Sequence, residues 1–255
     1  MMGVFLRGRA RMFERERGYP CAVTCNGAKE PQRAQAAAIR WVLEQQRVVG
    51  GQILLYVPQK GALHRSNSLT AEFATVPGVV VGTWRGHIDG WSGGPVLAAW
   101  PDREKLADIA DDDRTRALCV IPWAEGETTA WEHAAQPERL AGASASAAGP
   151  QLDPVVVVGL THLTQMVNHA NNLAGALDHR DAVAVLRTLH KGGYRLPADD
   201  VYAWALANGW PARGAERLRD MASKIDAGRT VQLKGPSPLR PGILKMWRAE
   251  AENSA

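Results

Sequence analysis

The chain has 255 residues, of which 45% are hydrophobic and 22% charged, a composition typical of a globular protein with one large or two ordinary domains. Its net charge is only +4, and no apolar run approaches the roughly 20 residues of a membrane-spanning helix. The basic first 17 residues contain Glu14 and Glu16 and lack the apolar stretch of a signal peptide, so we expect a cytoplasmic protein without membrane contact.

The charges are unevenly distributed along the chain. Residues 1–47 hold nine basic and four acidic residues, residues 48–210 hold 12 and 17, and residues 211–255 hold nine and five. Basic ends on either side of an acidic middle favour a negatively charged partner held by the ends of the chain.

The three cysteines do not predict a disulfide framework or a metal site. Cys21 and Cys25 have a C-x3-C spacing, which is unusual for zinc ligands, and Cys119 is far from both. We therefore expect reduced thiols and no bound metal.

In chain order, residues 1–30 show no clear periodicity and are expected to form an irregular basic arm. Residues 32–46 have apolar side chains at helical spacing, and Gly50 and Gly51 end this predicted helix. Four short, almost continuously apolar runs follow and predict strands that are covered on both faces. These runs are residues 53–57, 79–83, 96–100 and 117–122.

Helical patterns lie between most of these runs, at residues 68–76, 102–111 and 127–140. The alternation of strands and helices predicts an α/β, Rossmann-like domain with a mostly parallel sheet over residues 31–141. No helix is expected between the second and third runs, so the relative direction of these two strands stays open.

A second domain is expected after residues 142–150, an uncharged stretch of small residues with the composition of a linker. Residues 151–255 are helical in pattern almost throughout. The predicted helices are residues 154–177, 180–191, 198–208, 212–227 and 242–251, with a short strand-like piece at 230–234.

The most informative segment is residues 197–228, where two short helical patterns meet at an Asn-Gly-Trp-Pro sequence. Gly209 is a natural C-cap of the first helix, and Pro211 stands where a second helix can begin. One side of the second helix carries basic residues, namely Arg213, Arg217 and Lys224. This is the layout of a helix-turn-helix, whose basic second helix can lie in the major groove of DNA.

With its neighbouring segments, this region resembles the winged-helix variant of the helix-turn-helix over about a quarter of the chain. Counted from Val201 as the first position of the motif, Ala205 matches the small fifth residue and Gly209 the turn glycine. Trp210 and Leu218 match apolar positions that hold the second helix in place. The expected second domain is therefore an all-α, winged-helix-like part.

The resemblance implies binding to double-stranded DNA. Arg213 and Arg217 would lie nearest to base edges, because arginine pairs bidentately with guanine. The remaining basic side chains would lie closer to phosphates, namely Arg219, Lys224, Arg229 and Lys234. Two residues depart from the pattern: Gly214 weakens the second helix, and Ala215 stands where a branched apolar residue is common. We expect a regulatory or DNA-maintenance role, with the α/β part sensing a ligand or contacting a partner.

Two alternatives remain open. Parallel sheets bind ligands at the carboxyl ends of their strands, and the loop at residues 84–94 after the second run is rich in functional groups. A hydrolase or transferase would use Arg85 to hold an anionic substrate and His87 or Asp89 to move protons. The other alternative is a non-catalytic scaffold, whose helical half forms a homodimer or binds a protein partner.

Residues 90–95 satisfy the pattern G-x-S-x-G and look like the G-D-S-G-G-P nucleophile segment of trypsin-like proteases. A nucleophile elbow requires a strand before the serine and a helix after it, whereas a strand is predicted after Ser92. The protease segment has Asp where this chain has Trp91, and only 43 residues separate Val49 from Ser92, too few for the protease double barrel. We therefore do not expect a nucleophilic serine.

No cofactor is expected either. The sequence contains no P-loop motif, and no G-x-G-x-x-G follows the first predicted strand. His162 and His169 lie seven residues apart in a predicted helix, but two imidazoles need a third ligand to bind a metal, and none is evident.

Overall fold

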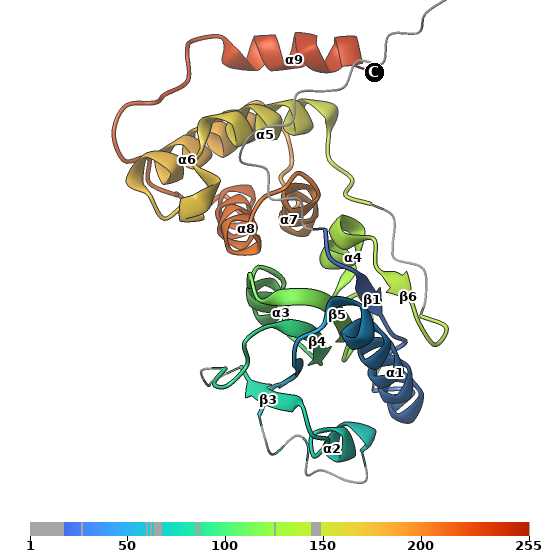
Figure 1. The fold of residues 1–255 in the computed structure, drawn as a ribbon. Coiled ribbons are helices and arrows are strands. Elements are labelled where there is room, and N and C mark those ends of the chain that lie inside the picture. Colours follow the sequence, from blue (N-terminus) through green and yellow to red (C-terminus); the bar gives the residue numbers. More distant parts are fainter. Residues whose placement is uncertain are drawn as a thin grey trace, which may run out of the picture.

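The computed structural model describes residues 18–254, except residues 27, 60, 62, 64–67, 85, 87, 125 and 144–148. Most of the predicted basic arm, residues 1–17, lies outside the described residues. Within the described part, an α/β part is followed by a helical part, and Figure 1 shows them one above the other.

The α/β part is built on a six-stranded sheet in the order β3-β2-β4-β5-β1-β6. All the strand pairings are parallel, which confirms the predicted Rossmann-like architecture. The strands are β1 (Cys21–Val23), β2 (Ile53–Val57), β3 (Val79–Thr83), β4 (Gly94–Ala99), β5 (Thr115–Ile121) and β6 (Glu138–Arg139). Between β3 and β4 the described residues of the 84–93 segment form no helix, and both strands pair parallel with β2, so they run in the same direction.

Two short strands at one side of the sheet, β1 and β6, were not predicted. β1 has only three residues and lies in a segment expected to be irregular, because so short an apolar run gives no periodicity. β6 lies inside the predicted helix at 127–140, which in fact ends earlier. Gln136 adopts a left-handed conformation with φ 45°, and Pro137 follows it, so the helix cannot continue into this region.

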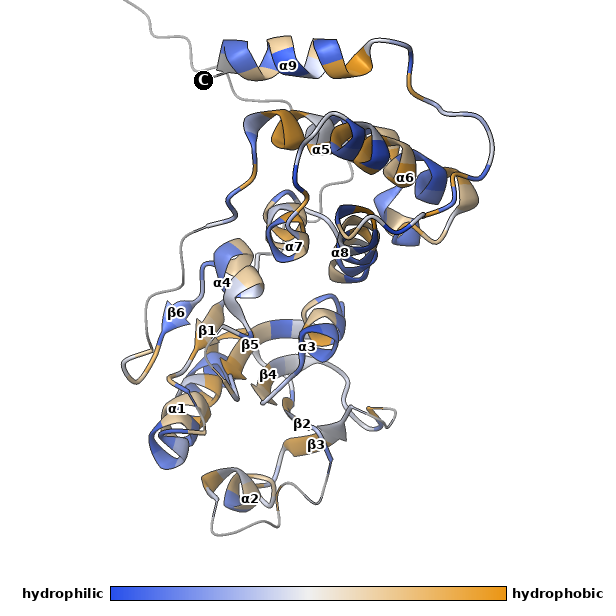
Figure 2. Ribbon diagram, turned by 180° about the vertical axis from the view of Figure 1, so that it is seen from behind, coloured by the Kyte–Doolittle hydropathy of each residue, from blue (hydrophilic) through white to orange (hydrophobic). Residues whose placement is uncertain are grey.

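Helices cover both faces of the sheet, as the continuous apolar runs predict. Ile53 and Leu55 of β2 face the core beneath α1 (Pro31–Val49) and α2 (Leu69–Phe73). Leu54 and Tyr56 face the opposite core, together with residues of α3 (Arg103–Ala110) and α4 (Thr129–Ala135). Figure 2 shows that the helices combine hydrophobic and hydrophilic residues, consistent with one covered side and one exposed side.

The glycine-rich segment at residues 90–95 has a structural role at the amino end of the sheet. The indole Nε1 of Trp91 donates to the carbonyl oxygen of Gln52 over 2.9 Å. Gly94 has φ 147°, and a Cβ at this position would lie 2.4 Å from the same carbonyl oxygen. The hydroxyl of Ser92 donates to Gln52 Oε1 at 3.3 Å. Close packing of β4 against the start of β2 therefore accounts for the pattern that looks like a hydrolase motif.

The helical part contains five α-helices and a 3₁₀ helix within residues 151–254. They are α5 (Pro154–Met166), η2 (His169–Asn171), α6 (Ala176–Lys191), α7 (Ala198–Ala207), α8 (Ala212–Asp226) and α9 (Ile243–Ser254). In Figure 1, α9 lies outermost, α5 and α6 form the next layer, and α7 and α8 lie beside α3 and α4. No helix in the described part of the chain is both long and apolar enough to cross a bilayer.

Two expectations for the helical part are wrong. The helix predicted to reach residue 177 ends at Met166, because Val167 is extended and Asn168 caps η2 by accepting from the Ala170 N–H. Residues 230–234 form no strand, so the predicted strand-like piece is wrong and these residues do not supply the strand of a wing. This segment instead continues the irregular connection between α8 and α9.

Asp226 at the end of α8 holds the segment that leads into α7. Its carboxylate accepts from the Leu196 N–H at 2.8 Å and from the Arg195 guanidinium at 3.0 Å. Burial on its own would raise the pKa of Asp226, but the hydrogen bonds from Arg195 and the Leu196 N–H outweigh it and hold the pKa below its usual value.

We expect Asp226→Ala to lower the free energy of unfolding by about 1–2 kcal/mol at neutral pH, because the buried Leu196 N–H loses its acceptor. Since the folded pKa is lowered, this stabilisation is complete above the usual carboxyl pKa and is lost as the pH falls through the lowered value. Urea unfolding at pH 7 and at about pH 3 measures both effects. Asp226→Asn is the control, because its amide oxygen can still accept the hydrogen bond from the Leu196 N–H. Equal losses of stability in the two variants would contradict the role of this hydrogen bond.

Candidate nucleic-acid interface and interdomain cleft

The predicted helix pair is confirmed as α7 and α8, joined by residues 208–211. Gly209 has φ 78°, and the Trp210 N–H donates to the carbonyl of Ala205 at 3.0 Å, which closes the end of α7. Trp210 is 1% exposed, and its Nε1 donates to Thr164 Oγ1 at 2.9 Å. Its ring also makes an edge contact with His169, with centroids 4.8 Å apart. The turn is therefore fixed against α5 and η2.

The first turns of α8 point toward the α/β part of the molecule. Arg213 Nε lies 2.7 Å from Asp108 Oδ1 of α3, although 64% of its side chain is exposed. Arg219 Nε lies 2.8 Å from Asp199 Oδ1 of α7 and is surrounded by Glu216 and Asp220. Two of the six side chains expected to contact DNA are thus paired with the protein's own carboxylates in this arrangement.

The other four expected DNA contacts form what we call the basic surface: Arg217, Lys224, Arg229 and Lys234. All four residues are exposed, and none forms a salt bridge with a carboxylate in the part of the chain that the structure describes. Arg217 donates to the carbonyl oxygen of Asn172 at 2.8 Å and lies two turns before Lys224 on the same side of α8. The Arg229 N–H donates to the carbonyl of Lys224 at 2.8 Å, which places the two residues next to each other.

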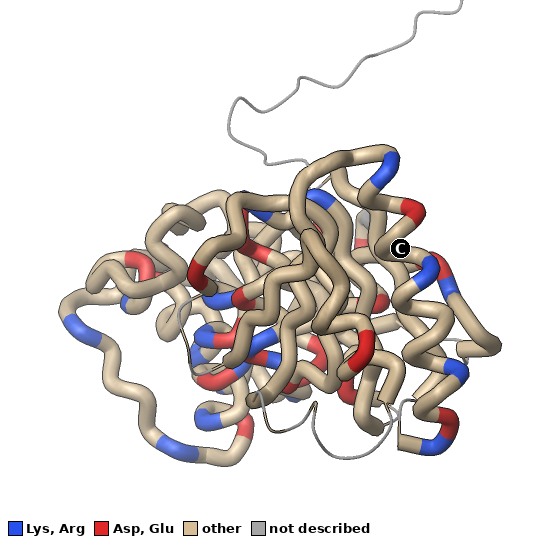
Figure 3. The backbone as a smooth tube through the Cα atoms, turned by 60° about the horizontal axis from the view of Figure 1, so that its bottom comes forward, with Lys and Arg blue, Asp and Glu red and all other residues tan. Residues whose placement is uncertain are grey.

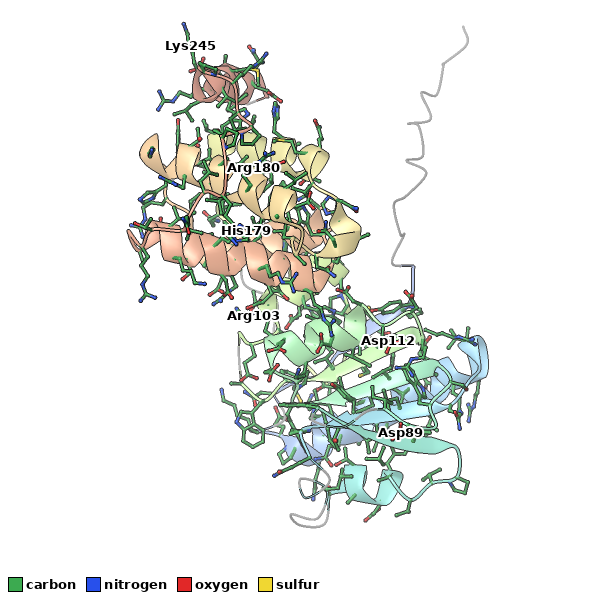
Figure 4. All side chains as sticks on the ribbon, turned by 90° about the vertical axis from the view of Figure 1, so that its left-hand side faces the viewer. Asp89, Arg103, Asp112, His179, Arg180 and Lys245 are labelled. Carbon is green, nitrogen blue, oxygen red and sulfur yellow. The ribbon has the colours of Figure 1, made fainter. Side chains whose placement is uncertain are left out.

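His179 shows that Lys234 belongs to the same region. The pKa of His179 is lowered by burial and further by the positive charges of Lys234 and Lys224. Figure 4 shows His179 and Arg180 in the part of α6 beside α8. The connection at residues 227–242 contains three basic and no acidic residues, and Figure 3 shows the basic positions along it.

A cleft of about 340 Å³ lies between the two parts, at the carboxyl end of β4 and β5. This is where parallel sheets commonly bind ligands. Its charged and polar lining comes from α3, α4 and α7 and from the loop before α4, namely Asp102, Arg103, Glu127, His133, Asp199 and Asp200. Gly149 of the linker lies against the His133 ring, so close that a Cβ would be 2.5 Å from Cε1.

Arg103 connects the cleft to α8. Its guanidinium lies 2.9 Å from Asp199 Oδ1 and 3.0 Å from Glu216 Oε2, and 5.4 Å from the ring centroid of Tyr202. The hydrogen bond from Arg219, together with the charges of both arginines, lowers the pKa of Asp199. Burial raises the pKa of Glu216 against the opposing effect of Arg103. Figure 4 shows Arg103 at the boundary between the two parts.

The loop considered for catalysis is only partly described. Arg85 and His87 lie outside the described residues, and Asp89 is exposed. Figure 4 shows Asp89 in the lower part of the molecule, away from Arg103. The residues that form the interdomain contacts, Arg103, Asp108 and Asp199, gave no signal in the sequence, because each belongs to an ordinary polar helix.

The histidines and cysteines considered as ligands are separated. His162 lies 3.1 Å from Glu250 of α9, whereas His169 bonds to the carbonyl oxygen of Thr164. Within residues 18–254, apart from the gaps given above, no group of three or more His, Cys, Asp or Glu is placed to hold a metal ion. Burial raises the pKa of the Cys25 and Cys119 thiols, so both are expected to stay protonated.

Comparison with known proteins finds similarity in the helical part. A family model for a domain of unknown function, DUF1889, matches residues 152–248. A crystal structure of a protein from Salmonella typhimurium is 18% identical, with a TM-score of 0.35, and the match covers 39% of this chain and 98% of that chain. No curated protein matches the chain. The region from α5 to the first half of α9 is thus similar to a domain family whose function is unknown.

Proposed function

We propose that this protein binds double-stranded DNA through the basic surface of its helical part. The observation that carries the proposal is the group of unpaired cations: Lys224, Arg229 and Lys234 extend from one end of α8 without a carboxylate partner among the described residues. Unpaired cations on one side of a helix pair suit the regularly spaced phosphates of a duplex.

The expected contacts are mainly to the phosphate backbone. Arg213 and Arg219, which would have to approach bases or phosphates, are engaged by Asp108 and Asp199. Contacts to phosphates position a protein on a duplex but do not read its sequence. In the arrangement described above, binding should therefore be strongly dependent on salt and only weakly dependent on DNA sequence.

The test is to compare the full-length protein with the variant Lys224→Ala/Arg229→Ala/Lys234→Ala. Removing three phosphate contacts should reduce the slope of log K against log salt by about 2.7, since each contact contributes about 0.9. Fluorescence anisotropy with a labelled duplex, measured from about 50 to 200 mM salt, gives this slope.

The matched control is Arg40→Ala/Arg47→Ala/Arg116→Ala, which removes three exposed charges from the α/β part. It lowers the net charge equally but should leave the slope unchanged. Equal reductions in both triple variants would show that net charge alone attracts DNA, and the basic surface would be rejected. A wild-type protein that does not bind the duplex at low salt would overturn the proposed function itself.

A further inference from the structure

The start of α8 is completed by the α/β part of the chain. Pro211 at the N-cap has no side chain that could accept a hydrogen bond, so α8 lacks a cap of its own. The Ala212 N–H instead donates to Asp111 Oδ2 at 2.5 Å, across the boundary between the two parts. Asp111 is the C-cap residue of α3, and Asp108 of the same helix holds Arg213 beside this bond. Two carboxylates of the α/β part thus cover the first turn of α8.

A second ionic contact lies farther along the same boundary. Arg103 of α3 reaches two carboxylates of the helical part, Asp199 of α7 and Glu216 of α8. Asp199 also binds Arg219, so one exposed carboxylate joins α3, α7 and α8. These ion pairs hold the first half of α8 against α3.

The apolar contact across this boundary is small. Among the described residues of the α/β part, those that join the core of the helical part are Ala107 of α3 and Ala130 and Ala134 of α4. Alanine side chains bury little apolar area, so their contribution to holding the two parts together is modest. The interface combines a few alanines with partly buried ion pairs, in which Arg103 and Glu216 are 33% and 25% exposed. Polar interfaces between the parts of one chain resemble transient interfaces, for which relative motion is the normal expectation.

We propose that the α/β part is an autoinhibitory cover over the first turns of α8. In a helix-turn-helix, the N-terminal residues of the second helix contact base edges in the major groove. Here these residues face α3, so they cannot enter the groove while the cover is closed. Opening would release Arg213 from Asp108 and add it to the basic surface, whereas Arg219 would keep its partner Asp199 of α7. This inference rests on the proposed DNA binding, because that binding is what the cover limits.

The test is Asp108→Lys in the full-length protein, which replaces the attraction to Arg213 by repulsion. Glu104→Lys is the matched control, since it makes the same charge change on α3 at a side chain that is 71% exposed and forms its ion pair with Lys105. The charge of Glu104 also acts on Arg213, but less than that of Asp108. Hydrogen exchange of the amides at residues 212–217 reports opening independently of DNA. Both variants are then titrated with the same labelled duplex.

We expect Asp108→Lys to raise both the exchange of residues 212–217 and the DNA affinity by about fivefold or more over Glu104→Lys. The double variant Asp108→Lys/Arg213→Glu, which restores an oppositely charged pair, should return the exchange to the wild-type rate. Unchanged exchange in Asp108→Lys, or increased exchange with the same DNA affinity as the control, would overturn the autoinhibitory cover. Increased exchange in a protein that never binds DNA would overturn the proposed function as well.

Discussion

Gly94→Ala should destabilise the α/β part by about 3–5 kcal/mol, through backbone strain and overpacking together. The φ of 147° at Gly94 is unfavourable for any residue with a side chain. The new Cβ would also lie 2.4 Å from the carbonyl oxygen and 3.0 Å from the amide nitrogen of Gln52. These are backbone atoms at the start of β2, so they cannot move away without disturbing the pairing of β2 with β4.

Urea unfolding followed by circular dichroism measures this loss. The control is Gly90→Ala in the same loop, where φ is 75° but no atom lies within 4 Å of the new Cβ. That variant should lose only about 1–2 kcal/mol from the left-handed conformation. If both variants lose the same stability, the close contact with Gln52 does not determine the requirement for glycine at position 94.

Trp210→Ala should lower the free energy of unfolding of the helical part by about 3–5 kcal/mol. The side chain is almost completely buried between the α7–α8 turn, α5 and η2. Its removal leaves a cavity, and the Thr164 hydroxyl, which donates to the carbonyl oxygen of Leu160, no longer accepts a hydrogen bond. Because the turn orients α8, the same variant should also lose DNA affinity and show faster hydrogen exchange along α8.

Two controls separate packing from the hydrogen bond at this position. Trp210→Phe keeps most of the buried ring but loses the bond to Thr164, so a loss of about 1–2 kcal/mol is expected. Trp123→Ala removes an indole that is 55% exposed and should change stability much less. A Trp210→Ala protein as stable as Trp123→Ala would show that the turn is not held by Trp210.

Much of the α/β fold could be predicted from the sequence because its four longest strands give apolar runs, including β3 at the edge of the sheet. β2, β4 and β5 are buried along almost their whole length, and each gives an uninterrupted apolar run. The strands that were missed, β1 and β6, have three and two residues, too few to show a period. The end of α5 was missed because the helix stops at extended backbone around Val167, which has no glycine or proline to mark it.

The candidate site was harder to predict, for a physical reason. The spacing of Arg213, Arg217 and Lys224 correctly places them on the exposed parts of α8. What each of them contacts depends on residues far away in the chain: Asp108 is 105 positions from Arg213, and Asn172 is 45 positions from Arg217. Helical periodicity carries no information about such partners. The sequence predicted that the arginines of α8 face a ligand. It gave no sign that α3 lies beside two turns of this helix and pairs with Arg213.

The bond from Ala212 to Asp111 has a consequence for any shortened form of this protein. A fragment that begins after the linker would keep the whole core of the helical part, except for the alanines of α3 and α4. Its α8, however, would start with an N–H group that no residue of the fragment is positioned to accept, so that end is expected to fray. The excised fragment would then behave differently from the same residues in the intact chain. The order of the first turn of α8 therefore depends on the α/β part.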